Sequence, residues 1–249
     1  MSTTPVARRW TAVMRKEWME VRQGARQGRH GLGLQLATQL VTGIVIGAAW
    51  ATSLFSSYLT TFGISIVAAG AILPLVGDAI AGERERHTLE TLLAFPVPTR
   101  TLLAGKLALL VAYASVGSLI VLTTATVTAM IETRGPLAVH WDVVAACLAL
   151  PVLVATSFAA GGLLLSGRSA SARGAQQQLA FILSGMMLVP LALFRLVPLA
   201  ARVHVLASLQ GSSAMVIVAL VAGGFLLLDV ALVTLVAAHL TRRRLLAAS

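Results

Sequence analysis

Six long apolar stretches dominate the chain, and short polar segments separate them. A helix of about 22 residues is roughly 33 Å long, enough to cross the hydrocarbon core of a bilayer. We therefore predict an all-α integral membrane protein with six transmembrane helices. The third stretch is long enough to require tilt or an extension beyond the membrane. The predicted spans are Leu32–Leu54, Tyr58–Ala81, Leu102–Ile131, Val143–Ser166, Gln178–Leu199 and Ser213–Leu240.

The segment before the first span predicts an amphipathic helix. Apolar residues recur there at helical spacing, and basic residues occupy the remaining surface. Such a helix lies along the membrane boundary, with its tryptophans at headgroup depth. It serves either as a plain lipid anchor or as a docking surface, and the sequence leaves both readings open. The apolar stripe consists of Trp10, Val13, Met14, Trp18 and Val21.

A charged segment with two prolines separates the second and third spans. It reads GERERHTLETLLAFPVPTRTLLAGK, from Gly82 to Lys106. Thr88 is suited to cap a short helix, and Pro96 and Pro98 end that helix before Thr99, which we expect to cap the third span. The sequence thus predicts a short, stiff helix outside the membrane.

That short helix has a leucine ridge and charged flanks. Leu89, Leu92 and Leu93 fall on one face of it. A leucine ridge is poorly suited to water and well suited to a groove on another protein. We therefore predict a docking element. Its charged and polar members are Glu83, Arg84, Glu85, Arg86, Thr88 and Glu90.

Composition and charge support a membrane location. Of the 249 residues 57% are hydrophobic and only 11% are charged, whereas about 25% are charged in an ordinary soluble domain. Sixteen of the nineteen Lys and Arg residues fall at the termini and in alternate connections, so both termini should be cytoplasmic. The net charge of +10 is therefore topogenic, and we expect no binding to nucleic acid.

Several residues inside the predicted spans invite further hypotheses. Gly43 and Gly47 form a GxxxG step, for which packing within one chain is favoured over a dimer seam. Gln35, Gln39 and Thr42, at the start of the first span, either face a polar cavity or satisfy one another. Asp229 is deep in the last span, where a structural pairing and a transport role are both open.

The charged segment resembles the signature of membrane subunits of ATP-binding-cassette (ABC) transporters of the type-2, mainly exporter, class. MRKEWMEVRQ, residues 14–23, also resembles the start of that family. One departure is His87, where the family usually has glycine, a residue that tolerates positive φ more readily. The resemblance implies one membrane domain over residues 1–249, with a cytoplasmic amphipathic segment at 1–31 and a coupling segment at 82–101.

The same resemblance implies how the chain works and with whom. It implies a permease subunit of the cytoplasmic membrane that pairs with a second permease, most simply a second copy, and with two separate ATPase chains. Residues 83–95 would form the main coupling helix, and Arg168 and Arg173 in the loop 167–177 a smaller contact. The chain has no GxxxxGK[ST] loop, so ATP and Mg²⁺ are expected on the partner ATPase. We expect no catalytic, cofactor or metal site in this chain.

Three other functions compete with ATP-driven export. A membrane enzyme lacks support, because the histidines are scattered and no HExxH or GxSG motif occurs. An ATP-independent secondary transporter would usually need intramembrane carboxylates for ion coupling or discontinuous helices near the midplane, and Asp229 alone is thin support. A permease of the same fold dedicated to maturation of an envelope metalloprotein, or to assembly of a surface machine, stays open.

Overall fold

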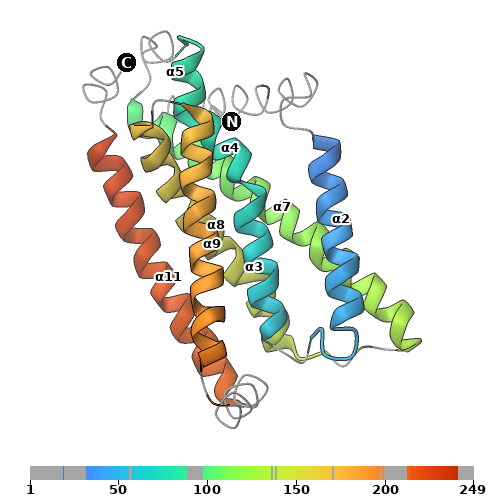
Figure 1. The fold of residues 1–249 in the computed structure, drawn as a ribbon. Coiled ribbons are helices and arrows are strands. Elements are labelled where there is room, and N and C mark those ends of the chain that lie inside the picture. The colour runs from blue at the N-terminus through green and yellow to red at the C-terminus, as the bar shows by residue number, and fades with distance from the viewer. Residues whose placement is uncertain are drawn as a thin grey trace, which may run out of the picture.

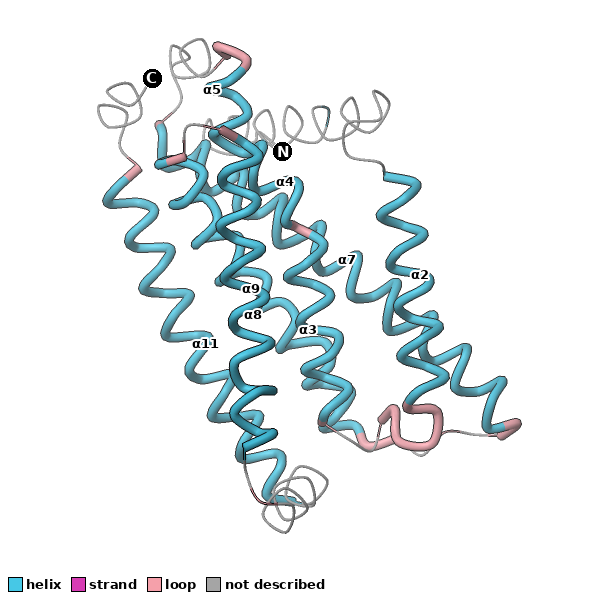
Figure 2. Tube along the Cα trace, in the orientation of Figure 1, coloured by secondary structure: helices cyan, strands magenta, loops and turns pink. Residues whose placement is uncertain are grey.

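The computed structural model consists of helices that run between two ends of the molecule (Figure 1). It describes residues 19, 32–55, 58–88, 98–135, 137, 139–169, 171–196, 198 and 212–240. Within these residues the chain forms helices and short turns and no strand (Figure 2). The helices are α2 (Leu32–Ala49), α3 (Leu59–Ala71), α4 (Leu73–Gly77), the π-helix η1 (Asp78–Gly82), α5 (Glu83–Glu85), α7 (Thr99–Thr133), α8 (Trp141–Arg168), α9 (Ala172–Leu196) and α11 (Ser212–His239).

Four of the described helical segments are long and apolar enough to cross a membrane. They are Thr60–Glu85, Thr99–Thr133, Trp141–Arg168 and Met215–His239, which match the second, third, fourth and sixth predicted spans. The first predicted span is a shorter apolar helix that ends at Ala49, and the fifth is α9. The all-helical membrane class is therefore confirmed, and six crossings stay a prediction.

The boundaries of two predicted spans need correction. Thr99 is the first residue of α7, and the residue before the helix is Pro98, with no side-chain cap. Pro is favourable near a helix start because it supplies no N–H that would need a partner. α9 begins at Ala172, so the predicted loop 167–177 is largely helical. The 35 residues of α7 run obliquely behind α2 and α3, as the length of that apolar stretch requires (Figure 1).

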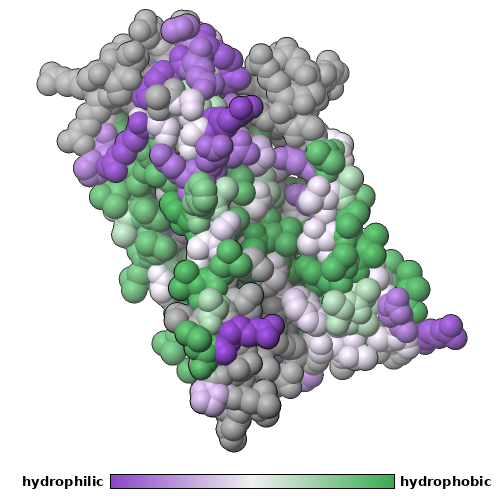
Figure 3. Space-filling view, viewed as in Figure 1, coloured by the Kyte–Doolittle hydropathy of each residue, from purple (hydrophilic) through white to green (hydrophobic). Residues whose placement is uncertain are grey.

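The second span is the most buried of the four and is not a regular α-helix. Pro74 stands at the start of α4, which ends at Gly77. The five residues after α4 form η1, and α5 then resumes the α-helical pattern. Ile64, Ile72 and Val76 of this span are fully buried against α8 and α7. α11 packs on α8 and leaves most of its apolar surface exposed on the flank of the molecule (Figure 3).

α2 packs chiefly on α7, through small residues. A Cβ on Gly43 would lie 2.8 Å from the carbonyl oxygen of Val121, and one on Gly47 would lie 2.5 Å from that of Ala125. Such contacts are possible only for glycine, which lets the two backbones approach closely. The GxxxG step therefore packs two helices of the same chain, as we predicted from the sequence.

The two glutamines of α2 also contact α7. Gln35 accepts a hydrogen bond from the Tyr113 hydroxyl, and the buried Gln39 packs against Gly117. They do not satisfy one another, because α7 supplies the partner surface for both.

Candidate functional site

The charged segment after the second span folds back against the body of the protein. α5 ends at Glu85, and the chain then turns at Arg86 and His87. His87 N–H donates to the Arg84 carbonyl at 3.0 Å, and Thr88 N–H donates to the Glu83 carbonyl at 2.9 Å. This pair of bonds is a Schellman motif, which needs a left-handed residue at the position of His87.

His87 has a φ of 54°, so a histidine occupies the conformation that glycine adopts most readily. The departure from the family pattern therefore leaves the turn intact. Thr88 adds a second bond to the same end, because its hydroxyl donates to the Glu83 carbonyl at 3.1 Å.

A buried ion pair fixes the start of this segment to α7. Lys106 Nζ lies 2.9 Å from Glu83 Oε1, and the two side chains are only 5% and 6% exposed. A buried charge is tolerated only when it is paired and hydrogen-bonded, so neither residue is easily replaced alone. We assign Glu83 to internal anchoring, since its charge points into the protein. Sequence reasoning missed Lys106 as its partner, although a lysine near the start of an apolar span is itself a signal.

The next two charges hold the turn between α8 and α9. Arg84 donates to the carbonyl oxygens of Ser169 and Gly167, at 2.8 and 3.0 Å. Glu85 Oε1 accepts from the backbone N–H of Ala172 at 3.1 Å, where a carboxylate also meets the positive end of the α9 dipole. The charged segment and the α8–α9 turn, which holds the predicted second contact, thus form one connected surface.

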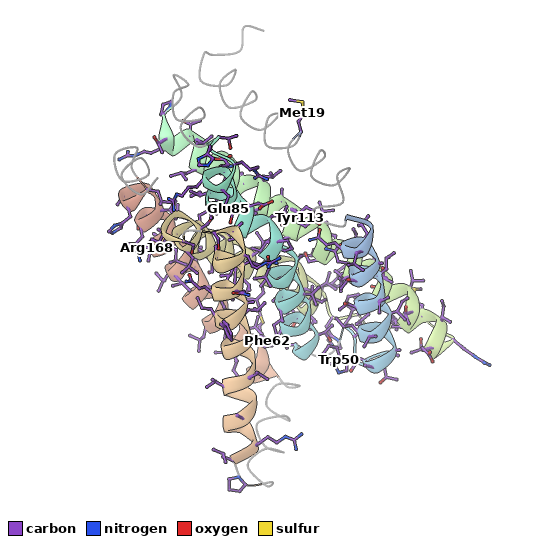
Figure 4. The ribbon with its side chains drawn as sticks, turned by 45° about the horizontal axis from the view of Figure 1, so that its top comes forward. Met19, Trp50, Phe62, Glu85, Tyr113 and Arg168 are labelled. Atoms are coloured by element: carbon purple, nitrogen blue, oxygen red, sulfur yellow. The ribbon has the colours of Figure 1, made fainter. Side chains whose placement is uncertain are left out.

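The outward-facing side chains around this turn are mostly basic. Arg86 lies 4.0 Å from Asp78, and the two side chains are 43% and 27% exposed. Arg168 ends α8 and Arg173 lies in the first turn of α9, and both are exposed. Figure 4 shows Glu85 and Arg168 at one end of the molecule and Trp50 toward the other. The hydrophilic surface gathers over the same end (Figure 3).

Several predicted site residues lie outside the described residues. These are the leucine ridge with its acidic neighbour, Leu89, Glu90, Leu92 and Leu93, and the stripe Trp10, Val13, Met14, Trp18 and Val21. Their roles stay predictions. The structure does fix where the chain leaves α5 and where it enters α7.

Asp229 has a partner inside the protein. Its Oδ1 accepts a hydrogen bond from the hydroxyl of Ser157 on α8, and both residues are buried. The bond joins α11 to α8. This geometry favours the structural pairing over a transport role for the carboxylate.

A bundle of long apolar helices with a charged, turn-closed segment at one end is a multi-pass membrane protein. A family model described as "ABC-2 family transporter protein" matches residues 19–213, and the chain belongs to that family. It is thus a membrane permease component of an ABC transporter. No curated protein and no solved structure matches the chain.

Proposed function

We propose that this chain is the membrane-spanning half of an ATP-driven exporter of the cytoplasmic membrane. A separate ABC ATPase docks on its cytoplasmic end, and two permease chains, most simply two copies, act with two ATPase chains. ATP and Mg²⁺ bind to the ATPase partner. The basic excess at one end, to which Arg84, Arg100 and Arg168 contribute, supports six crossings with both termini inside.

The observation that carries this proposal is the anchoring of the charged segment. Glu83 is locked to α7, and Arg84 and Glu85 are locked to the α8–α9 turn, at the cytoplasmic end by charge distribution. A force applied to residues 88–97 would therefore reach α7, α8 and α9 as well as the second span. A flexible loop between two spans would not transmit such a displacement.

The mechanism needs only a difference in affinity between two states. ATP-driven closure of the ATPase pair would favour one arrangement of the docking elements over the other. The charged segment continues the second span through α5, and it is fixed to α7 and to the α8–α9 turn. A shift of the docking element therefore tilts these helices together. The carboxylate of Asp229 is occupied by Ser157, which argues against ion-driven secondary transport.

Co-purification tests the docking. The full chain, purified in mild detergent with its native ATPase, should lose that subunit when Leu89, Leu92 and Leu93 are all changed to serine. The matched control is the triple methionine variant, which keeps the ridge apolar and similar in volume and should keep the ATPase. Equal ATPase binding by the serine variant would reject the proposal, and so would transport by the permease alone in liposomes.

A further inference from the structure

One buried side chain of α8 is inserted into the backbone of the second span. Ser166 has no exposed surface, and its hydroxyl lies beside η1. Its Oγ accepts from the N–H groups of Ile80 and Ala81, at 3.1 and 2.9 Å. The same hydroxyl donates to the carbonyl oxygen of Gly77 at 3.3 Å. A hydroxyl has one donor and two acceptor positions, so all three are used here.

The two groups that Ser166 joins are the ones that an α-helix would join directly. In an α-helix the N–H of residue 81 bonds to the carbonyl of residue 77. Here the hydroxyl stands between Ala81 and Gly77, and the intervening residues take the wider π-helical turn. Insertion of a side chain into the hydrogen-bond ladder is a known cause of helix distortion, and single π turns are frequent at functional sites.

Glycines on both sides bring the serine this close. A Cβ on Gly162 of α8 would lie 2.2 Å from Val76 Cγ1, and one on Gly77 would lie 2.6 Å from the carbonyl oxygen of Ala172. Gly162 therefore lets α8 approach the Val76 side chain of the second span closely, and Gly77 lets the second span approach the backbone of α9. The hydroxyl is small enough to enter the gap, and it supplies the polar groups that the π turn needs.

The π turn sets the direction in which the charged segment points. It accommodates one extra residue, so closing it to a regular α-helix would rotate everything after it by about 100° and advance it by about 1.5 Å. Glu83 and Arg84 follow η1 directly. After such a rotation Glu83 would no longer face Lys106, and Arg84 would no longer face the α8–α9 turn.

We infer that the second span has two registers and that Ser166 is the positioning residue that holds the π register. In that register Glu83, Arg84 and Glu85 are turned inward on α7 and the α8–α9 turn. In the α register the same charges swing away from those partners. The register change is a property of this chain alone, and its coupling to ATPase movement rests on the proposed function.

Distance measurement between two spin labels tests this inference. The labels are placed at Arg86, after the π turn, and at Ala104, an exposed residue of α7, in the full chain reconstituted in lipid nanodiscs. The single cysteine, Cys147, is changed to serine in every sample. S166A should shift the Arg86 label by about 8 Å, the chord of a 100° rotation on a helix of about 5–6 Å radius.

The matched control is S65A. Ser65 is also buried and lies in the same span, but its hydroxyl donates only to Thr61 of its own helix, at 2.7 Å. S65A should leave the label distance unchanged. If Ser166 has a purely structural role, S166A will lower the melting temperature and leave the distance between the two labels unchanged. That result would overturn the inference.

A deletion provides the second, independent arm. Removing Ala79 from η1 takes out the extra residue, so an α-helix then gives the wild-type direction without the hydroxyl. S166A with Ala79 deleted should therefore return the wild-type distance. If S166A alone does not fold, the double variant must fold and give that distance, and its failure would also overturn the inference. No ATPase is present in these samples, so the outcome is separate from the docking test.

Discussion

Replacing Lys106 with methionine should destabilise the protein strongly, because it removes the buried cation that lies 2.9 Å from the carboxylate of Glu83. The two side chains are 5% and 6% exposed, and Lys106 Nζ and Glu83 Oε1 are 2.9 Å apart. Removing one partner of a buried pair typically costs about 3–5 kcal/mol of unfolding free energy. For a chain of this size that loss lowers the melting temperature by on the order of 10 °C. E83Q should have a similar effect, since it removes the carboxylate that lies 2.9 Å from the buried ammonium group.

The double variant E83Q/K106M separates ion pairing from general disruption. With both charges removed, the buried ion pair is replaced by two neutral side chains, so the loss should be well below the sum of the single losses. The coupling free energy should be at least about 2 kcal/mol. Thermal unfolding of the detergent-purified protein is followed by intrinsic tryptophan fluorescence. It is measured for the wild type, the two single variants and the double variant, which together form the double-mutant cycle.

A matched control uses the neighbouring exposed pair. Arg86 and Asp78 are 4.0 Å apart and their side chains are 43% and 27% exposed, so R86Q should cost less than about 1 kcal/mol. Additive losses in the cycle, within about 0.5 kcal/mol, would refute the reasoning. Glu83 would then not depend on Lys106, and the segment would need another anchor.

Three further predictions concern single positions. H87G should raise the free energy of unfolding by about 1 kcal/mol in a denaturant titration, because glycine adopts the φ of 54° without steric cost, and a loss would contradict the Schellman geometry. G47A should lower the melting temperature by an amount equivalent to about 1–3 kcal/mol, since its Cβ meets the α7 backbone at 2.5 Å, whereas G223A, with open space around it, should not lower it. Y58F should cost about 1–2 kcal/mol, because Asp142 loses the hydroxyl that donates to it, and an unchanged unfolding curve would show that this bond contributes nothing.

Much of the fold follows from the sequence because the bilayer dictates the length of each element. Runs of about 20 apolar residues have no other stable arrangement in lipid than a helix. The spans of α7, α8 and α11 were therefore predicted to within a few residues. The GxxxG step of α2 was equally readable, because close helix packing requires small residues at that spacing.

Which charged side chains of the segment after the second span point into the protein was not predictable in the same way. Alternating Glu and Arg residues show that a segment is polar, but not which charge is buried. Glu83 points inward because Lys106 approaches it from α7, and Arg84 does so because the α8–α9 turn presents two carbonyl groups. These partners are distant in the sequence, so only the fold brings them together.

The role of Ser166 was hidden for a related reason. A serine in an apolar helix usually donates to a carbonyl of its own preceding turn, as Ser115 of α7 does to Val111 at 2.8 Å. Nothing in the local sequence distinguishes the two serines. The distinction comes from the π turn of the second span, whose backbone groups need a partner at that level.

The most direct test of the central claim is photo-crosslinking from Leu92 in the native membrane. A photoreactive amino acid at this position, in the full chain, should form a crosslink to a polypeptide that carries a GxxxxGK[ST] nucleotide-binding loop, identified by mass spectrometry. The same probe at Trp141, at the opposite end of the molecule, should not. Absence of that crosslink from Leu92, or labelling of a Leu92 cysteine variant by a membrane-impermeant thiol reagent added outside intact cells, would contradict docking of an ATPase at the cytoplasmic end.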